Sequence, residues 1–144
     1  MYEHDTVELL KECDAGIEMG ISGIDDVLDY VSSSSLKEFL VDNSKKHHEL
    51  KVEINELLDK YNLNGESSNK LVKAMSRTKT KLELLINKTD EKIADIITDG
   101  CNMGVKSLNR YLNQYEAAEE KVKDITKRLI NLEEKLAIDI RQYL

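Results

Sequence analysis

The fold is decided by the stretch 5–31, which reads DTVELLKECDAGIEMGISGIDDVLDYV. Its apolar residues recur every three or four positions, so they fall on one stripe of an α-helix. The stripe consists of Leu10, Cys13, Ile17, Ile21, Ile24, Leu28 and Val31. Asp5 followed by Glu8 has the form of a capping box, and the serine run 32–35 is expected to end the helix. The stretch therefore predicts a long amphipathic helix with one face in a core.

Residues 35–62 predict a second long helix. It begins at another capping box, Ser35 with Glu38, and ends before the turn signal Asn64-Gly65. Its apolar stripe consists of Leu36, Phe39, Leu40, His47, Leu50, Ile54, Leu57, Leu58 and Tyr61. This helix, too, is expected to place one face in a core.

Two more stripes follow in the second half of the chain. The first is expected to begin near residues 87–89, and a turn at 113–116 separates it from the second. They consist of Ala94, Cys101, Val105, Leu108 and Leu112, and of Ala118, Val122, Ile125, Leu129, Leu132, Leu136, Ile140 and Tyr143. Since the chain also has no proline and only seven aromatic residues, the sequence predicts an all-α protein.

Residues 68–86 predict a weaker amphipathic helix between the second and third long helices, with its lysines on the polar side. A helix of about 19 residues spans about 28 Å, which is enough to run most of the length of a bundle of long helices. We therefore expect one domain, 1–144, with the ferritin-like arrangement of a four-helix bundle and an amphipathic helical crossover between helices 2 and 3. A five-helix up-and-down bundle is the alternative fold.

The net charge of −7 is unevenly distributed along the chain. Residues 1–34 carry nine acids and one lysine, which gives −8, whereas residues 67–88 carry six basic residues and one acid, which gives +5. The acidic balance argues against a phosphate-binding surface, so no nucleic-acid partner is expected. The acidic stretch is either a docking face for a charged partner or a face that is solvated or matched within the molecule.

Localisation and cysteine chemistry follow from what the sequence lacks. No run approaches the roughly 18 apolar residues that span a bilayer, and residues 1–5 lack the basic and apolar pattern of a signal peptide, so a cytoplasmic protein without a membrane span is expected. Cys13 and Cys101 are too few for a disulfide scaffold and match no zinc spacing. Both are predicted to be core residues, with a redox role as the alternative.

The two halves of the chain resemble each other. The run 9–17, LLKECDAGI, aligns with 97–105, ITDGCNMGV, and both contain Cys-x-x-Gly followed by a β-branched apolar residue. The run 50–58, LKVEINELL, aligns with 136–144, LAIDIRQYL. Two helical hairpins related by a pseudo-two-fold axis would produce this similarity, and chance similarity between amphipathic helices is the alternative.

The paired hairpins and the segments 13–17 and 99–104 resemble functionally unassigned bacterial proteins of the ferritin-like superfamily, over nearly the whole chain. The resemblance implies the helix pairs 1–2 and 3–4 and a metal position midway along the bundle. Di-iron sites of that superfamily need a Glu from each of two helices and a Glu-x-x-His from each of the other two. The chain contains no Glu-x-x-His, so a metal-dependent oxidase, the one enzyme class considered, is not expected.

Helical angles nevertheless place one polar residue of each long helix near the core: Asp14, His47, Asn102 and Glu133. Asp14, His47 and Glu133 could hold a single Fe, Mn or Zn ion, with the amide of Asn102 as a degenerate fourth position. The alternative is a buried, hydrogen-bonded polar cluster that specifies the register of the helices without chemistry. His48 is expected to point outward.

The sequence thus favours a non-catalytic helical-bundle protein that acts through a protein partner or self-association, with no catalytic or cofactor-binding residues. The first alternative is a ferritin-like metal-binding protein of metal storage or stress response. The second is a helical adaptor for a membrane or for a small apolar ligand inside the bundle.

Overall fold

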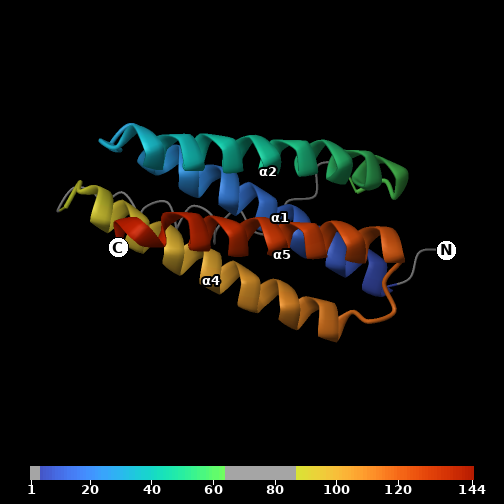
Figure 1. Cartoon of the computed structure of the whole chain (residues 1–144). Coiled ribbons are helices and arrows are strands. Elements are labelled where there is room, and N and C mark those ends of the chain that lie inside the picture. The colour runs from blue at the N-terminus through green and yellow to red at the C-terminus, as the bar shows by residue number, and fades with distance from the viewer. Residues whose placement is uncertain (1–3, 64–86) are drawn as a thin grey trace.

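The computed structural model describes residues 4–63 and 87–144, and these residues are helical apart from short turns. The elements are α1 (His4–Leu28), α2 (Ser34–Lys60), α4 (Asp90–Gln114), α5 (Glu120–Ile140) and the 3-10 turn η1 (Arg141–Tyr143). Figure 1 shows the four long helices side by side in one bundle. The all-α prediction is confirmed over the described ranges, which contain no strand. The helix predicted at 68–86 lies outside them.

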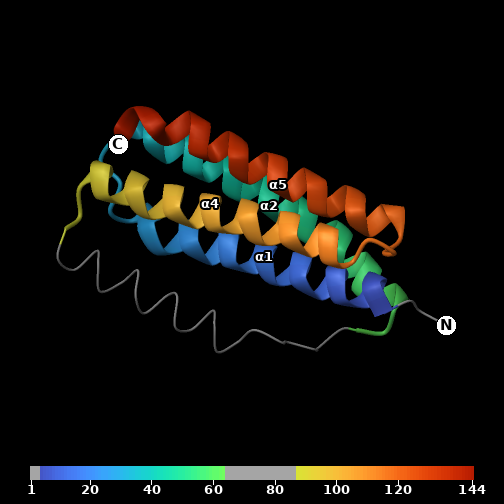
Figure 2. The ribbon, with the colours of Figure 1, turned by 90° about the horizontal axis from the view of Figure 1, so that it is seen from below.

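The bundle consists of two helical hairpins. α1 packs on α2 and α4 packs on α5, and the hairpins join because α1 also packs on α4 and α2 on α5. Followed along the chain in Figures 1 and 2, α1 and α5 run in one direction, and α2 and α4 run in the other. The end of α2 and the beginning of α4 therefore lie at opposite ends of the bundle. The predicted crossover between them falls on residues 64–86, outside the described part of the chain.

The core is divided into two apolar clusters along the bundle axis. The first cluster consists of Leu9, Leu10, Cys13, Ile17, Leu50, Ile54, Leu57, Leu58, Tyr61, Leu108, Ala118, Val122, Ile125, Leu129, Ile130 and Leu132. The second consists of Ile24, Val27, Leu36, Leu40, Ile93, Ile97, Cys101, Leu136 and Ile140. Burial of these side chains is the main force that holds the helices together. The region between the two clusters contains the candidate site.

The stripes predicted for α2 and α5 match the core most closely. Every predicted residue of α5 up to Ile140 is buried. On α4 the prediction was partly wrong, because Ile93 and Ile97 are buried core residues that the predicted stripe lacks. Val105 and Leu112 are only partly buried. The core-facing side of α4 is thus rotated relative to the predicted stripe, toward Ile93 and Ile97.

The first turn of α1 differs from its prediction and forms what we call the first clasp. Asp5 lies inside the helix rather than at its N-cap, and its carboxylate accepts the backbone N–H of Ala117 at 3.0 Å. The hydroxyl of Thr6 accepts the backbone N–H of Glu119 at 2.9 Å. These contacts hold the α4–α5 loop against α1. The polar side chains at this terminus therefore bind the other hairpin instead of capping α1.

A second clasp closes the opposite end of the bundle. The carboxylate of Asp90, in the first turn of α4, accepts the backbone N–H groups of Ser32 and Ser33 in the α1–α2 loop at 2.8 and 2.9 Å. Ser33, not the predicted Ser35, caps α2, and the hydroxyl of Ser35 bonds to that of Tyr143 instead. In each clasp, the first turn of one hairpin binds the loop of the other.

Two other predicted boundaries can be compared with the structure. Thr89 caps α4 by accepting the N–H of Lys92 at 3.1 Å, which confirms the predicted start near 87–89. α2 ends at Lys60, before the predicted turn signal, and Asn62, two residues further on, has a left-handed φ of 56°. The N–H of Leu63 then bonds to the carbonyl of Leu58, as in a Schellman motif, in which asparagine is the usual substitute for glycine.

Candidate functional site

A polar layer separates the two apolar clusters. Each long helix contributes one residue to this central layer: Gly20 from α1, His47 from α2, Gly104 from α4 and Glu133 from α5. The glycines make room for the polar side chains of the helices beside them. A Cβ on Gly20 would lie 2.5 Å from Nε2 of His47, and a Cβ on Gly104 would overlap the carboxylate of Glu133. The layer is thus a paired arrangement in which each hairpin provides one glycine and one polar side chain.

His47 is almost completely buried, at 1% exposure, and half of its hydrogen-bonding capacity is used. Its Nδ1 lies 3.0 Å from the backbone carbonyl of Asn43. A carbonyl can only accept, so Nδ1 carries the proton and donates, and Nε2 is left as an acceptor. That Nε2 is buried without a partner. Burial lowers the pKa of His47, which favours the neutral ring.

Glu133 is the acidic counterpart of His47 in the second hairpin. It is 6% exposed, and its Oε2 has no hydrogen-bond partner. Burial raises the pKa of Glu133 from 4.5 to about 8. The carboxyl group therefore carries its proton at neutral pH and is a donor as well as an acceptor.

Three other polar side chains lie beside the layer. Asn43 donates from Nδ2 to the carbonyl of Leu132 at 3.1 Å, which joins α2 to α5, while its Oδ1 is buried without a partner. Cys13 and Cys101 are buried, and burial raises the pKa of each thiol to about 12. The prediction that both are core residues is confirmed. At such a pKa neither thiol is an effective nucleophile.

The structure buries only two of the four polar residues that helical angles placed near the core, His47 and Glu133. Asp14 lies at the α1–α2 surface, where Lys51 pairs with it and with Glu18. Asn102 is exposed, so its predicted core-facing position is wrong. A residue about 60° from the centre of a stripe lies at the margin of the core, and the rotation of its helix decides whether it is buried. His48 is exposed, as predicted.

These positions bear directly on the predicted metal site. In the ranges 4–63 and 87–144, no three His, Cys, Asp or Glu side chains are grouped closely enough to hold a metal ion. The structure therefore does not assemble the predicted set of Asp14, His47 and Glu133.

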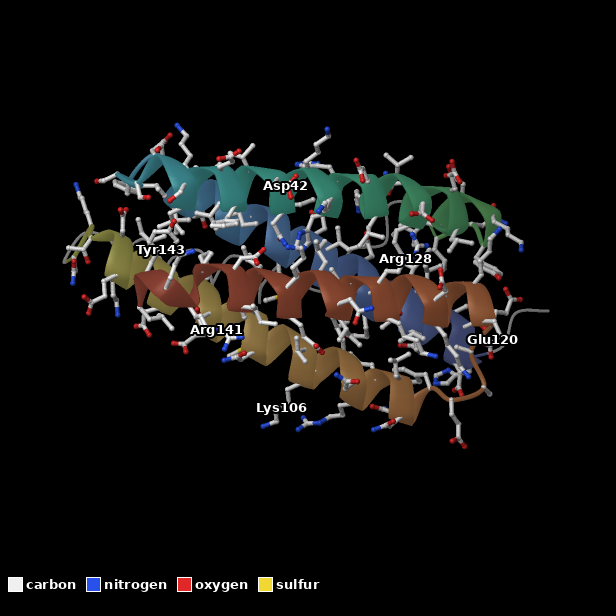
Figure 3. All side chains as sticks on the ribbon, in the orientation of Figure 1. Asp42, Lys106, Glu120, Arg128, Arg141 and Tyr143 are labelled. Carbon is white, nitrogen blue, oxygen red and sulfur yellow. The ribbon has the colours of Figure 1, made fainter. Side chains whose placement is uncertain are left out.

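The side chains on the outer surface are largely charged, and Figure 3 shows Lys106 pointing away from the bundle.

One signal in the sequence pointed to the glycines of the central layer, which the prediction from helical angles did not include. Helical glycine is unfavourable by up to about 1 kcal/mol relative to alanine, so Gly20 and Gly104 indicate a close contact. A helical glycine commonly allows two helices to approach closely, whereas each of these two glycines accommodates a polar side chain of the neighbouring helix. Among the glycines that the structure describes, only Gly16 has apolar neighbours of this kind, Leu108 and Leu129.

Comparison with known proteins adds no relative: no protein-family model, no curated protein and no solved structure matches this chain. None of the helices in the described residues is both long enough and apolar enough to cross a membrane.

Proposed function

We propose that the chain is a non-catalytic helical-bundle protein that acts through protein contacts, with α1 as its docking face for a basic partner. The concentration of negative charge on α1 supports this proposal. α1 contains seven acids and one lysine, whereas α2 and α4 each carry one excess acid and α5 is neutral. A single-sign face of this kind steers oppositely charged partners and sets specificity.

One part of this face combines acids with aromatic rings, and we call it the acidic aromatic edge. It consists of His4, Glu8 and Glu12 of α1, of Tyr111 of α4, and of Tyr115, which directly follows α4. The rings of Tyr111 and Tyr115 stack with centroids 6.3 Å apart, and His4 meets Tyr115 edge-on at 6.2 Å. Carboxylates beside aromatic faces are the groups that bind lysine and arginine side chains, through ion pairs and cation–π contacts.

Titration of a fluorescently labelled peptide rich in lysine and arginine tests this function. We expect saturable binding that weakens as salt is added, and a loss of about three- to tenfold in affinity for the Glu8→Gln, Glu12→Gln variant, because each exposed charge pair contributes little by itself. The matched control is Asp95→Asn, Asp99→Asn, which removes two exposed acids one turn apart on α4. Equal affinities for the two variants, or no binding at all, would contradict a basic partner at this edge.

We also propose a ferritin-like connection between the hairpins, as the sequence predicted. The parallel directions of α2 and α4 support it, since a chain that ends α2 at one end of the bundle must begin α4 at the other. The metal-binding alternative has no comparable support, because Asp14 is paired with Lys51 rather than turned toward the central layer.

A further inference from the structure

We propose that the central layer is a proton-operated latch, which holds the two hairpins together while Glu133 carries a proton and His47 does not, and which loosens the bundle when either state changes. The proposal goes beyond the docking function, because it concerns the interior of the bundle rather than the face of α1. It rests on where the layer lies, on which of its atoms lack partners, and on the charges around it.

The location makes any charge in the layer costly. The first and second apolar clusters lie on either side of it, so neither His47 nor Glu133 has a route to water along the bundle axis. Across the bundle, the backbones at Gly20 and Gly104 close the space at the tips of the two side chains. A group that becomes charged here can regain hydration only if the helices move apart.

The hydrogen-bonding inventory of the layer favours one added proton. Nε2 of His47, Oδ1 of Asn43 and Oε2 of Glu133 are all buried acceptors without a partner. Nδ1 of His47 donates to Asn43, and Nδ2 of Asn43 donates one of its two hydrogens to Leu132. A proton on Glu133 adds a strong donor to this group of acceptors, whereas its loss adds a negative charge and one more acceptor.

No charged group of a neighbouring helix offsets a charge on Glu133. The titratable groups that interact with it are Cys13 from α1 and Cys101 from α4, and His47 of α2 lies in the same layer. Both thiols are protonated, since the pKa of each is raised to about 12. The basic residues of its own helix are used at the surface: Arg128 pairs with Glu53 and Asp124, and Lys135 pairs with Asp139. The remaining neighbour, η1, bonds through Tyr143 to Ser35 at the end of the bundle.

The two residues define opposite limits of pH. The pKa of Glu133 is raised in the folded protein, so between about pH 4.5 and 8 folding retains a proton that the unfolded chain releases, and stability falls as pH rises. The pKa of His47 is lowered, so below its ordinary value of 6.5 the unfolded chain takes up a proton that the folded protein does not, and stability falls as pH falls. Between about pH 4.5 and 6.5 the two effects oppose each other, so stability changes little there, and it falls between pH 6.5 and 8 as Glu133 ionises.

The test compares matched glutamine variants by urea unfolding from pH 5 to 9, with a chelator present. For the wild type, the unfolding equilibrium constant is expected to rise by up to about tenfold per pH unit between pH 6.5 and 8 relative to Glu133→Gln, which cannot ionise. Glu134→Gln, the exposed neighbour, should follow the wild type. Below pH 6.5, where the effect of His47 offsets that of Glu133 in the wild type, His47→Gln should gain stability relative to the wild type as pH falls, and His48→Gln, whose side chain is exposed, should not.

An infrared measurement on the wild type keeps the proposal testable even where a variant folds poorly. The carbonyl band of a protonated carboxyl group should be present at pH 7, should disappear above pH 8, and should be absent from Glu133→Gln. Parallel pH profiles for the wild type and Glu133→Gln, or an ionised Glu133 at pH 7, would overturn the latch. Stoichiometric Fe, Mn or Zn in untagged protein, lost in Glu133→Gln, would also overturn it, because a metal ion would hold the carboxylate in its charged form.

Discussion

Gly20→Ala is expected to destabilise the bundle strongly for so small a change. The added Cβ would lie 2.5 Å from Nε2 of His47, a buried aromatic ring that Asn43 holds in place. Displacing a packed side chain of this kind costs typically about 1–3 kcal/mol, which exceeds the gain of up to about 1 kcal/mol in helix propensity. Urea unfolding at a fixed pH measures the difference.

The same helix provides the control for this substitution. A Cβ on Gly23 would have no neighbour within 4 Å, so Gly23→Ala is expected to stabilise the protein by up to about 1 kcal/mol. On α4, Gly104 and Gly100 form the equivalent pair: Gly104→Ala should destabilise through Glu133, and Gly100→Ala should stabilise. Equal effects at Gly20 and Gly23 would show that the central layer tolerates an added methyl group, contrary to its tight packing.

Replacing the polar residues of the central layer by apolar ones is expected to stabilise the protein. In the double variant His47→Leu, Glu133→Met the first and second apolar clusters would become continuous, and the unpartnered atoms of both side chains would be lost. Substitution of buried polar groups by apolar groups of similar volume is often stabilising, by about 1–4 kcal/mol in favourable cases. Thermal unfolding at pH 8, where Glu133 is partly ionised, should show the largest rise in Tm.

The exposed neighbours again give the control. His48→Leu with Glu134→Met changes the same residue types on the surface and should alter stability by no more than about 0.5 kcal/mol. A more stable central variant would mean that the layer is retained for function at the expense of stability. A less stable variant, or one with broad, poorly dispersed NMR signals, would contradict this prediction and would mean that the layer specifies the register of the helices.

The fold could be predicted from the sequence to the extent that it depends on local periodicity. The predicted stripe from Ala118 to Ile140 was confirmed because its spacing is regular over the whole range, although Ile130, which the stripe lacks, is buried as well. The start of α4 was predicted without any glycine or proline to mark it, because two stripes that are out of phase cannot belong to one straight helix. Thr89 then provides the cap.

The capping residues were harder to predict because their partners are remote in sequence. Asp5 has the right type and spacing for an N-cap, yet its carboxylate is bonded to Ala117. Ser33 and Ser35 are equally suitable caps for α2, and contacts with Asp90 and Tyr143 decide between them. Such choices depend on residues that meet only after the hairpins have come together.

Of the four polar residues that the sequence placed near the core, two belong to the candidate site. The sequence pointed to His47 and Glu133 because helical angles place both near the core, and both are buried. The same angular argument included Asp14 and Asn102, which the rotation of α1 and α4 leaves outside the core. The pairing of each polar residue with a glycine of the adjacent helix could not be predicted, since it requires the register between two helices.

The two clasps have the form of an isologous interface. Each hairpin uses side-chain oxygens of its first turn to accept backbone N–H groups from the loop of the other hairpin. A symmetric dimer of one ancestral hairpin would make both clasps with a single set of residues, the first turn of each copy holding the loop of the other. Any residue that such a dimer buried on its axis would have to be the same in both copies. A single chain with two hairpins is free of that constraint. The basic His47 of one hairpin can then lie in the same layer as the acidic Glu133 of the other, whereas a symmetric dimer would have the same residue at both positions.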